Sequence, residues 1–356
     1  MAGMLENLEF DVSKFAERGI EFFEEEEILH CKIDSFFAFE YLISSLGRGS
    51  FHYDCTWDRF YRGVSNKEYD LICSLCVNNL EDKESDIINS LYSRAPDEFS
   101  ACKTDFEMVA LMQHYGLPTR LLDFTRNPMI ALWFACQRDA KFKFGDADGA
   151  VYLAFSSRNT PKKIVDSIFK MALADDIDKI VDLGNIFSKS EIYDYIFASE
   201  IHLNHMLFLD APIVDLRERN QQAVFLLGVN DILMSNKSNS NEKRLLKSDN
   251  FIEALAELNN ESSSIRFDLG EIHCYQKSRD SDKILKIIIP KELKKEMLYE
   301  LSVRGIDETF IYPTLDNYCK EIKRQAKHRH DVHEEKWELY KKYLLEYTEN
   351  SKNDTQ

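Results

Sequence analysis

The sequence predicts an α+β protein: a single mixed α/β globular unit with a central, largely antiparallel sheet and a charged C-terminal helix. Two observations support this fold class. The chain has 356 residues, 44% of them hydrophobic and 12% aromatic, so it can fill one large core. Short runs with strand character lie between runs with helical apolar spacing, and no internal repeat is found. We therefore expect an N-terminal segment at 1–34, a main domain at 35–325 and a charged helical tail at 326–356.

Strands are predicted where short apolar or aromatic runs are bounded by turn residues. The run AVYLAF follows an Asp148-Gly149 turn, and KILKIIIP ends at Pro290. The run AVFLLGV is apolar throughout, which is typical of a buried strand. The predicted strands are 56–61, 150–155, 212–214, 223–229 and 283–289.

Helices are predicted where apolar residues recur with helical spacing between capping residues. Thr104 can cap one helix, and Asn127 before Pro128 suits the start of the next, because Asn caps well and Pro is favoured in the first turn. Gly305 is expected to end the last helix of the main domain. The predicted helices are 35–46, 79–95, 105–114, 129–138, 158–205 and 291–304, and the polar segment 230–249 is predicted to be a loop.

Composition and sequence pattern argue against several classes of protein. The net charge of −17 disfavours binding to nucleic acid, which needs a basic surface. The N-terminus lacks the basic and apolar regions of a secretory signal, and no apolar run approaches the roughly 18 residues of a membrane span. The eight cysteines are scattered, which suits reduced thiols in a cytosol. We therefore expect a cytoplasmic protein with no membrane partner.

Two local patterns resemble metal ligands, but neither predicts a metal site. Cys73 and Cys76 form a CxxC pair without a second pair, so core packing is the preferred interpretation and a metal or redox role the alternative. His328, His330 and His333 lie on a charged helical segment, where a solvated face is the preferred interpretation and metal binding the alternative. We expect the chain to fold without metal.

Two segments place polar residues densely between apolar ones. One is Phe60-Tyr61-Arg62-Gly63, and the other is QHYGLPTRLLDFTRNPMIALWFA at 113–135. A polar side chain held in apolar surroundings must find a partner or cost free energy. These segments therefore predict a functional site, or the polar frame behind one.

Arg62 is the first candidate of this site. Its planar guanidinium can hold a phosphate or a carboxylate with two bonds, and Gly63 would let backbone approach a ligand closely. The alternative is a buried ion pair between Arg62 and Asp123 that holds two segments together. Asp123 could instead fix Arg120. We expect Arg62 and Asp123 to lie within salt-bridge distance.

Other polar residues of the second segment have two interpretations each. His114 could act as an acid or base, or cap a helix C-terminus. Tyr115 could stack on a nicotinamide or adenine ring, or lie in the core. Thr125 could bind a ribose hydroxyl, whereas Asn127 is expected to be a helix N-cap.

With FYRG at 60–63 and GLPTRLLDFTRNP at 116–128, the chain resembles the FRG domain family, which is named for a Phe-Arg-Gly signature. Tyr61 here takes the aromatic position beside the arginine. DGAVYLAF, NQQAVFLLG and the segment that begins KIIIPKELKK also look similar to the family pattern. The resemblance spans about residues 35–325.

The family layout looks similar to ADP-ribosyltransferases of the Arg–Ser/Thr–Glu kind. Arg62 and Thr125 match the first two positions. Near the third position stand Gln221 and Gln222, with Glu218 three residues before Gln221, and a neutral amide supplies little charge stabilisation. The resemblance implies Glu218, Gln222 and Asp123 as catalytic candidates, and Arg62, Gly63, His114, Tyr115, Arg120 and Thr125 as NAD-binding candidates.

We therefore expect an FRG domain protein with an ADP-ribosyltransferase-like cleft for a small nucleotide, with NAD as the expected substrate. The reaction would be NAD cleavage or ADP-ribosyl transfer to a protein target, in a toxin or phage-defence role. The alternative is a non-catalytic module that binds a nucleotide or a protein partner through the same cleft. The Arg–Thr layout favours the enzyme, and the missing Glu favours the module.

Overall fold

The computed structural model describes residues 12–25, 28–48, 58–139, 147–156, 162–174, 180–182, 188, 206–212, 216–228, 232–236, 239–244, 263–268, 272, 274, 284–326, 337 and 341. The chain divides into two compact units, residues 1–304 and 305–356. The three histidines at 328, 330 and 333 lie outside the described residues, as does most of the predicted helix 158–205 and of the predicted strand 212–214. Within the described part of the chain, no helix has the length and apolarity needed to cross a membrane.

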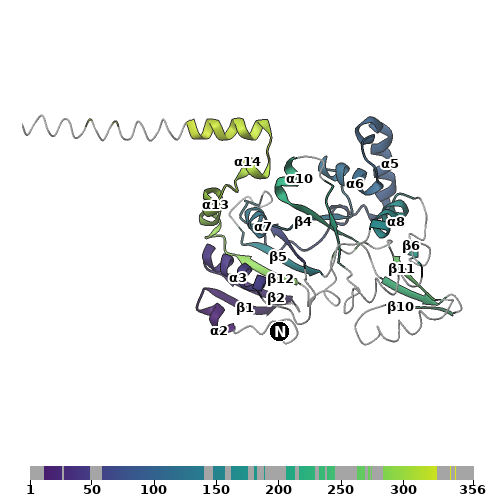
Figure 1. Cartoon of the computed structure of the whole chain (residues 1–356), viewed down its shortest axis with the longest axis horizontal. Helices are drawn as coiled ribbons and strands as arrows, with labels where there is room; N and C mark the ends of the chain where they lie inside the picture. Colours follow the sequence, from purple (N-terminus) through teal and green to yellow (C-terminus); the bar gives the residue numbers. More distant parts are fainter. Residues whose placement is uncertain are drawn as a thin grey trace, which may run out of the picture. The chain divides into compact units, whose positions relative to one another are not determined.

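An eight-stranded sheet forms the centre of the first unit, in the order β1-β2-β12-β5-β3-β4-β8-β7 (Figure 1). Neighbouring strands are antiparallel except β2 and β12, which are parallel. The predicted fold class, with its largely antiparallel sheet, is confirmed. The strands are β1 (Ile20–Glu25), β2 (Ile28–Ile33), β3 (Asp58–Val64), β4 (Leu121–Thr125), β5 (Gly149–Ser156), β7 (Leu207–Asp210), β8 (Ala223–Leu227) and β12 (Ile284–Ile289).

A second sheet has four strands in the order β10-β9-β11-β6. Its strands are β6 (Ile180–Asp182), β9 (Ile232–Asn236), β10 (Asn239–Arg244) and β11 (Ser263–Asp268). These strands correct two predictions, because β6 lies in the predicted helix 158–205 and β9 and β10 lie in the predicted loop 230–249. The pairing of β11 with both β6 and β9 is a contact between distant segments, which local periodicity does not reveal.

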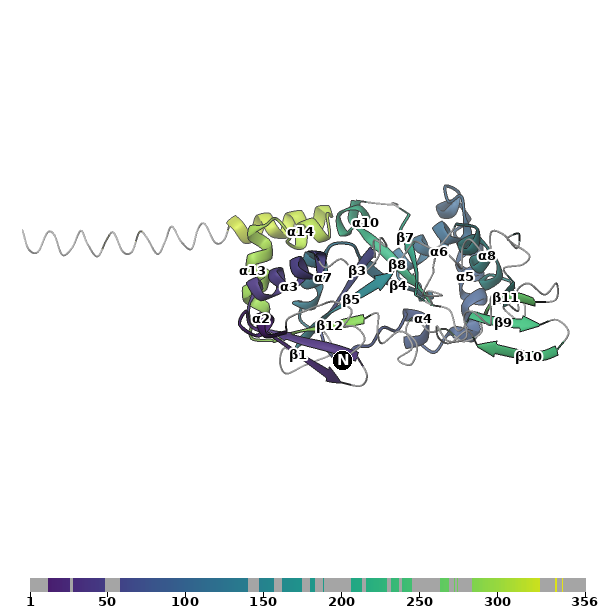
Figure 2. The ribbon, with the colours of Figure 1, turned by 60° about the horizontal axis from the view of Figure 1, so that its bottom comes forward.

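Most helices of the first unit pack on one face of the large sheet (Figure 2). They are α2 (Val12–Ala16), α3 (Phe36–Arg48), α5 (Glu84–Arg94), α6 (Asp105–His114), α7 (Pro128–Ala135), α8 (Lys162–Ala172), α10 (Leu216–Gln221) and α13 (Lys294–Val303), while α4 (Ser74–Val77) packs on the opposite face. Two short 3₁₀ turns, Glu81–Lys83 and Pro96–Phe99, flank α5. The second unit contains α14 (Glu308–Ile311) and a helix at 315–326.

The alternation of side chains along β3 assigns the two faces. Tyr61 and Gly63 face the helices, whereas Phe60 and Arg62 face α4. A Cβ atom on Gly63 would lie 1.8 Å from the carbonyl oxygen of Ala131 in α7. The close approach that Gly63 permits is therefore that of α7 to the sheet.

Predicted caps position the elements around the site. The Thr104 side chain accepts a hydrogen bond from the Glu107 N–H at the start of α6, and Asn127 accepts one from Met129 at the start of α7. Gly305 has φ of 79° just after α13, which is favourable for glycine alone among the common residues. Residues 20–25 and 28–33, assigned by sequence to a separate N-terminal segment, form β1 and β2 of the large sheet.

Candidate functional site

Four polar side chains lie in one row across four neighbouring strands, and Phe23 of a fifth strand lies at one end of this row. We call these five residues, which are Phe23, His30, Lys286, Tyr152 and Arg62, the polar row. Lys286 of β12 is paired with His30 of β2 and with Tyr152 of β5. Tyr152 is paired with Arg62 of β3, and His30 with Phe23 of β1. Directly paired residues point to the same face of a sheet. The register therefore aligns five side chains on the face opposite the main helix layer.

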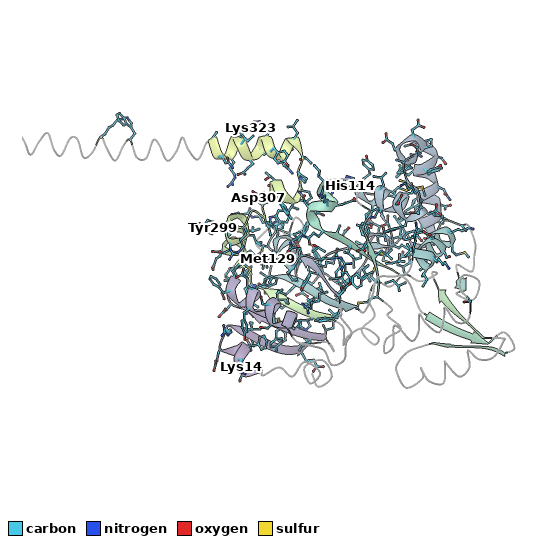
Figure 3. The ribbon with its side chains drawn as sticks, in the orientation of Figure 1. Lys14, His114, Met129, Tyr299, Asp307 and Lys323 are labelled. Carbon is cyan, nitrogen blue, oxygen red and sulfur yellow. The ribbon has the colours of Figure 1, made fainter. Side chains whose placement is uncertain are left out.

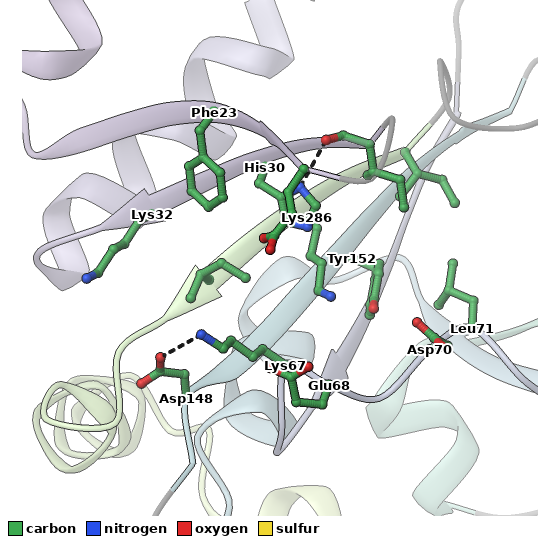
Figure 4. Close-up of a pocket in the computed structure, with 14 residues that line it drawn as sticks. Phe23, His30, Lys32, Lys67, Glu68, Asp70, Leu71, Asp148, Tyr152 and Lys286 are labelled. Carbon is green, nitrogen blue, oxygen red and sulfur yellow. Dashed lines mark hydrogen bonds and ion pairs between the residues drawn. The ribbon is translucent and has the colours of Figure 1, made fainter. Parts of the chain in front are cut away.

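A pocket of about 300 Å³ lies over the part of the polar row formed by Phe23, His30, Lys286 and Tyr152 (Figure 4). The rings of Phe23 and His30 stack with their centres 5.3 Å apart. Lys286 Nζ lies 5.3 Å from the centre of the Tyr152 ring. The other lining residues are Glu25, Ile28, Lys32, Lys67, Glu68, Asp70, Leu71, Asp148, Ile284 and Ile288.

The segment that follows β3 forms a second wall of this pocket. Tyr152 Oη donates a 2.7 Å hydrogen bond to the carbonyl oxygen of Tyr69, and Lys67 Nζ lies 3.3 Å from the Asp148 carboxylate. Burial raises the pKa of Asp148, but the backbone N–H of Lys291 and the Lys67 ammonium outweigh burial and hold it below its ordinary value. Asp148 is thus ionised at neutral pH, and its ion pair with Lys67 holds that lysine in the pocket wall.

The pocket presents charges of both signs beside apolar surface. Its cations are the lysines 32, 67 and 286, and its acids are Glu25, Glu68, Asp70 and Asp148. Phe23 and Ile288 supply apolar contact. Such a lining suits a ligand with anionic groups for the ammonium ions, together with hydroxyl or cationic groups for the carboxylates.

Arg62 lies at the other end of the polar row and reaches Asp123. Its Nη1 donates a 2.5 Å hydrogen bond to the Asp123 carbonyl oxygen and lies 3.9 Å from the carboxylate. The predicted approach of these two residues within salt-bridge distance is confirmed. The side chain of Arg62 is 22% exposed and that of Asp123 68%, so this is not the buried ion pair of the alternative interpretation.

Two further observations concern the Arg62 guanidinium. Burial lowers the pKa of Arg62 and Asp123 counteracts the shift, yet the group stays protonated because its ordinary pKa lies far above neutrality. Its Nε is buried and has no hydrogen-bond partner among the described residues. A buried donor of this kind normally has an acceptor, so Arg62 Nε is a donor whose hydrogen-bonding capacity is unused among the described residues.

Asp123 continues into a polar chain on the helix-covered side. The Gln113 amide donates a 2.8 Å hydrogen bond to the Asp123 carboxylate, and the Thr119 hydroxyl donates to the Gln113 amide oxygen. The Thr119 N–H donates to the Ser74 hydroxyl at 3.0 Å. We call residues 116–128, GLPTRLLDFTRNP, the signature segment. These bonds join the signature segment to α4 through Thr119 and to Arg62 through Asp123.

Arg120 is fully buried in an ion pair with Glu84. Its Nε donates a 2.7 Å hydrogen bond to one carboxylate oxygen, Nη2 donates to the other, and Nη1 donates to the Gly228 carbonyl oxygen at 3.1 Å. Burial alone would lower the pKa of Arg120, but Glu84 outweighs it and raises the pKa. Arg120, an NAD-binding candidate by sequence, thus holds α5 and β8 to the signature segment.

The residues that match the transferase layout at β4 and β8 form a separate group. Thr125 Oγ1 donates a 2.6 Å hydrogen bond to the Gln221 carbonyl oxygen and accepts one from the Asn127 N–H at 3.0 Å. Gln222 has φ of 47°, a left-handed conformation that is uncommon without glycine. Glu218 is buried in α10. Thr125 here ties the end of β4 to the turn before β8.

His114 is the last residue of α6 (Figure 3). Tyr115 follows as the C-cap of the helix, just before Gly116. The Tyr115 side chain is 67% exposed, so it is not the core residue of the alternative interpretation. The two rings meet edge to face with centres 5.5 Å apart. They are carried by the same helix as Gln113, and they are not among the residues that line the pocket.

Sequence reasoning missed most of the pocket. Phe23, His30 and Lys32 lie in the segment that was set apart from the main domain, and Glu68 follows the FYRG signature without a motif of its own. One signal was present: Lys286 interrupts the apolar strand KILKIIIP, and a lysine on a buried strand needs a partner or a solvated cavity.

Comparison with known proteins gives one match. The model of the FRG domain family matches residues 58–143, which run from β3 past α7 and include Arg62, Arg120 and Asp123. No curated protein and no solved structure matches the chain.

Proposed function

Because the chain carries an FRG domain at residues 58–143, we propose that it binds an anionic nucleotide, NAD as first candidate, in the pocket of the polar row. The observation that carries this proposal is the register that aligns Lys286, Tyr152 and Arg62 on one face of the sheet. Lys32 and Lys286 would hold phosphate oxygens. Phe23 would pack against a ring of the ligand.

The mixed charge of the pocket supports NAD over a simple phosphate. NAD combines two phosphates with ribose hydroxyls and a positively charged nicotinamide ring. Glu68 and Asp70 line the pocket and can accept hydrogen bonds from hydroxyls. The volume of about 300 Å³ is near the lower end of the roughly 300–1,000 Å³ of small-molecule sites, so it suits one nucleotide half of NAD.

Arg62 would complete the site beside the pocket. Asp123 holds one arm of the guanidinium, which keeps the fork in a fixed orientation. The buried Nε supplies a further donor that has no partner among the described residues. A bidentate guanidinium discriminates between phosphate geometries better than an ammonium does, so Arg62 would fix the position of the ligand and not merely its charge.

The proposed reaction is NAD cleavage or ADP-ribosyl transfer, which would serve a toxin or defence role. A carboxylate near the scissile bond is what such chemistry needs. Glu68 and Asp70 lie at the pocket, whereas Glu218 is buried in α10 and Gln222 precedes β8. The second candidate, a nucleotide-binding module without catalysis, is favoured by the neutral Gln222 at the position where the transferase layout has Glu.

Calorimetric titration of the full chain with NAD tests binding. Arg62→Ala should abolish binding, and Lys286→Ala should weaken it about thirtyfold, because one charge-assisted contact of about 2 kcal/mol is lost. Arg62→Lys should weaken binding less than Arg62→Ala, since the charge remains without the fork. Lys170→Ala on the exposed face of α8 is the matched control and should bind as the wild type does.

Nicotinamide release, followed by chromatography, separates the two candidate functions. Release that is lost in Glu68→Gln or Asp70→Asn with little change in affinity would support the enzyme. Binding without release would support the module. Absence of NAD binding by folded wild-type protein, together with unfolding of Arg62→Ala, would make Arg62 structural and overturn the proposal.

A further inference from the structure

Three cysteines meet beneath the signature segment, on the sheet face opposite the main helix layer. The Sγ atoms of Cys73 and Cys76 lie 3.3 Å apart, and Cys76 Sγ lies 3.3 Å from the Ile272 carbonyl oxygen. Cys274 is buried in the same apolar cluster as Cys73. Cys73 is fully buried and Cys76 is half-buried, so the pair has one member close to solvent.

The backbone around these sulfurs is tightly packed. A Cβ atom on Gly228 would lie 3.3 Å from Cys274 Sγ and 3.1 Å from the Arg120 carbonyl oxygen. Gly228 and Arg120 are also joined by a backbone hydrogen bond of 2.9 Å. The cysteine cluster therefore packs close to Arg120, which is buried in its ion pair with Glu84. This close packing leaves the three sulfur atoms little room to move apart.

The two thiols of the CxxC pair are chemically unequal. Hydrogen bonds from the Cys274 and Cys76 thiols lower the pKa of Cys73 to about 3 against the effect of burial, and the charge of Arg120 adds to this shift. The same contact with Cys73, together with burial, raises the pKa of Cys76. Burial raises the pKa of Cys136 to about 12 and also raises that of Cys31. The contacts among these sulfurs thus favour the thiolate form at Cys73 over the other cysteines compared.

We propose that Cys73 and Cys76 form a reversible dithiol–disulfide couple that responds to a hydroperoxide. The Cys73 sulfur attacks the peroxide oxygen, the O–O bond breaks, and Cys73 becomes a sulfenic acid while water or an alcohol leaves. The Cys76 sulfur then attacks Cys73, loses its proton and expels water. Two thiols are oxidised to one disulfide, and the hydroperoxide is reduced by two electrons.

The geometry favours this pair. A disulfide needs an S–S distance of about 2.05 Å, so the sulfurs must close by about 1.3 Å from their present 3.3 Å. Both residues lie on one short turn, with Cys73 as the N-cap of α4. A metal is the competing use of clustered cysteines, but among the described residues no group of three Cys, His, Asp or Glu is arranged to hold one.

Oxidation would reach the signature segment through α4. Ser74 and Leu75, which lie between the two cysteines, bond to the backbone of Thr119: the Leu75 N–H donates to the Thr119 carbonyl oxygen at 3.1 Å, and the Thr119 N–H donates to Ser74 Oγ at 3.0 Å. Closing the disulfide must turn α4 and so disturb these bonds. Thr119 leads through Gln113 to Asp123 and Arg62.

Peptide mass spectrometry on the full chain tests the couple. The reduced protein is treated with stoichiometric hydrogen peroxide, free thiols are blocked with N-ethylmaleimide, and the chain is digested with trypsin. Cleavage after Lys67 and Lys83 leaves both cysteines in the peptide 68–83, whereas Cys274 falls in the peptide 267–277. The expected product is peptide 68–83 with two hydrogen atoms lost and no maleimide added, restored to the dithiol by dithiothreitol.

Variants assign the role of each sulfur. Cys76→Ser should leave Cys73 as a sulfenic acid that dimedone captures. Cys274→Ala should slow oxidation about tenfold, because alanine has no donor to replace the hydrogen bond that the Cys274 thiol gives to Cys73. Cys319 is an exposed cysteine of the second unit and serves as the control. In Cys319→Ser, hydrogen peroxide should oxidise the 68–83 peptide as fully as it does in the wild type. Wild-type peptide 68–83 that remains fully maleimide-labelled while Cys319 is oxidised would overturn the proposal, as would a cross-link between 68–83 and 267–277 as the main product.

Amide hydrogen exchange tests the link to α4 without any ligand. Oxidation should speed exchange of the Leu75 and Thr119 amides on the order of tenfold, because each loses its acceptor. Unchanged exchange at both amides in fully oxidised protein would show that the disulfide is isolated from the signature segment.

Discussion

Glu84→Gln should strongly destabilise the first unit of this protein, because it removes the anion that neutralises a fully buried arginine. The Arg120 and Glu84 side chains are 0% and 1% exposed, and Arg120 spends two nitrogens on the carboxylate. In the variant, the hydrogen bond from Arg120 Nη1 to the Gly228 carbonyl oxygen, 3.1 Å long in the wild type, does not depend on residue 84. Water cannot replace the lost carboxylate in a core packed this closely.

The expected cost follows from burial. Removing one partner of a buried ion pair typically costs about 3–5 kcal/mol, because the remaining charge stays desolvated. At about 2–4 °C per kcal/mol for a unit of this size, the melting temperature should fall by roughly 10 °C. The double variant Glu84→Leu with Arg120→Met should cost much less than the sum of its parts, since no uncompensated charge remains.

Guanidinium or urea denaturation, followed by tryptophan fluorescence, measures this cost. Glu300→Gln is the matched control, because Glu300 pairs with Arg304 at 2.7 Å on α13 with side chains 29% and 35% exposed. A pair of this exposure should contribute at most about 0.5 kcal/mol. If Glu84→Gln and Glu300→Gln cost the same, the Arg120–Glu84 pair does not hold the signature segment.

Three further predictions concern packing, capping and pH. Gly63→Ala should cost about 3 kcal/mol in denaturation, because its Cβ would lie 1.8 Å from the Ala131 carbonyl oxygen; a neutral result would mean that α7 moves freely. Asn127→Ala should cost about 1 kcal/mol by losing the α7 cap, while Asn127→Asp keeps it; equal stability of the two would refute the cap. Asp148→Asn should cost under about 1 kcal/mol at pH 7. The difference from wild type should begin to shrink as pH falls below the ordinary carboxyl pKa of about 3.8 and be lost once pH passes below the lowered pKa of Asp148 in the folded protein. A difference that stays constant from pH 7 down to about pH 2 would exclude ionisation of Asp148 as its source.

Local structure and the family signature could be recognised from the sequence without the tertiary structure. The caps at Thr104 and Asn127 and the stop at Gly305 were readable because capping needs side chains only a few residues away. The apolar runs predicted β5, β8 and β12 because strand character depends on residues adjacent in the chain, whereas β4 was not predicted. The approach of Arg62 to Asp123 could also be predicted, because both lie in short segments whose polar groups need partners.

The pocket could be recognised only in the tertiary structure, because its lining residues come from distant parts of the chain. His30 and Lys286 are far apart in the chain, and only the parallel register of β2 and β12 places them side by side. A shift of one residue in that register would turn Lys286 to the opposite face, and nothing in a strand of alternating side chains fixes its partner. The same holds for Cys274, which joins the CxxC pair only through folding. Caps and turns depend on residues that are neighbours in the chain, so they can be predicted from the sequence. The grouping of distant side chains depends on which strands pair and in which register.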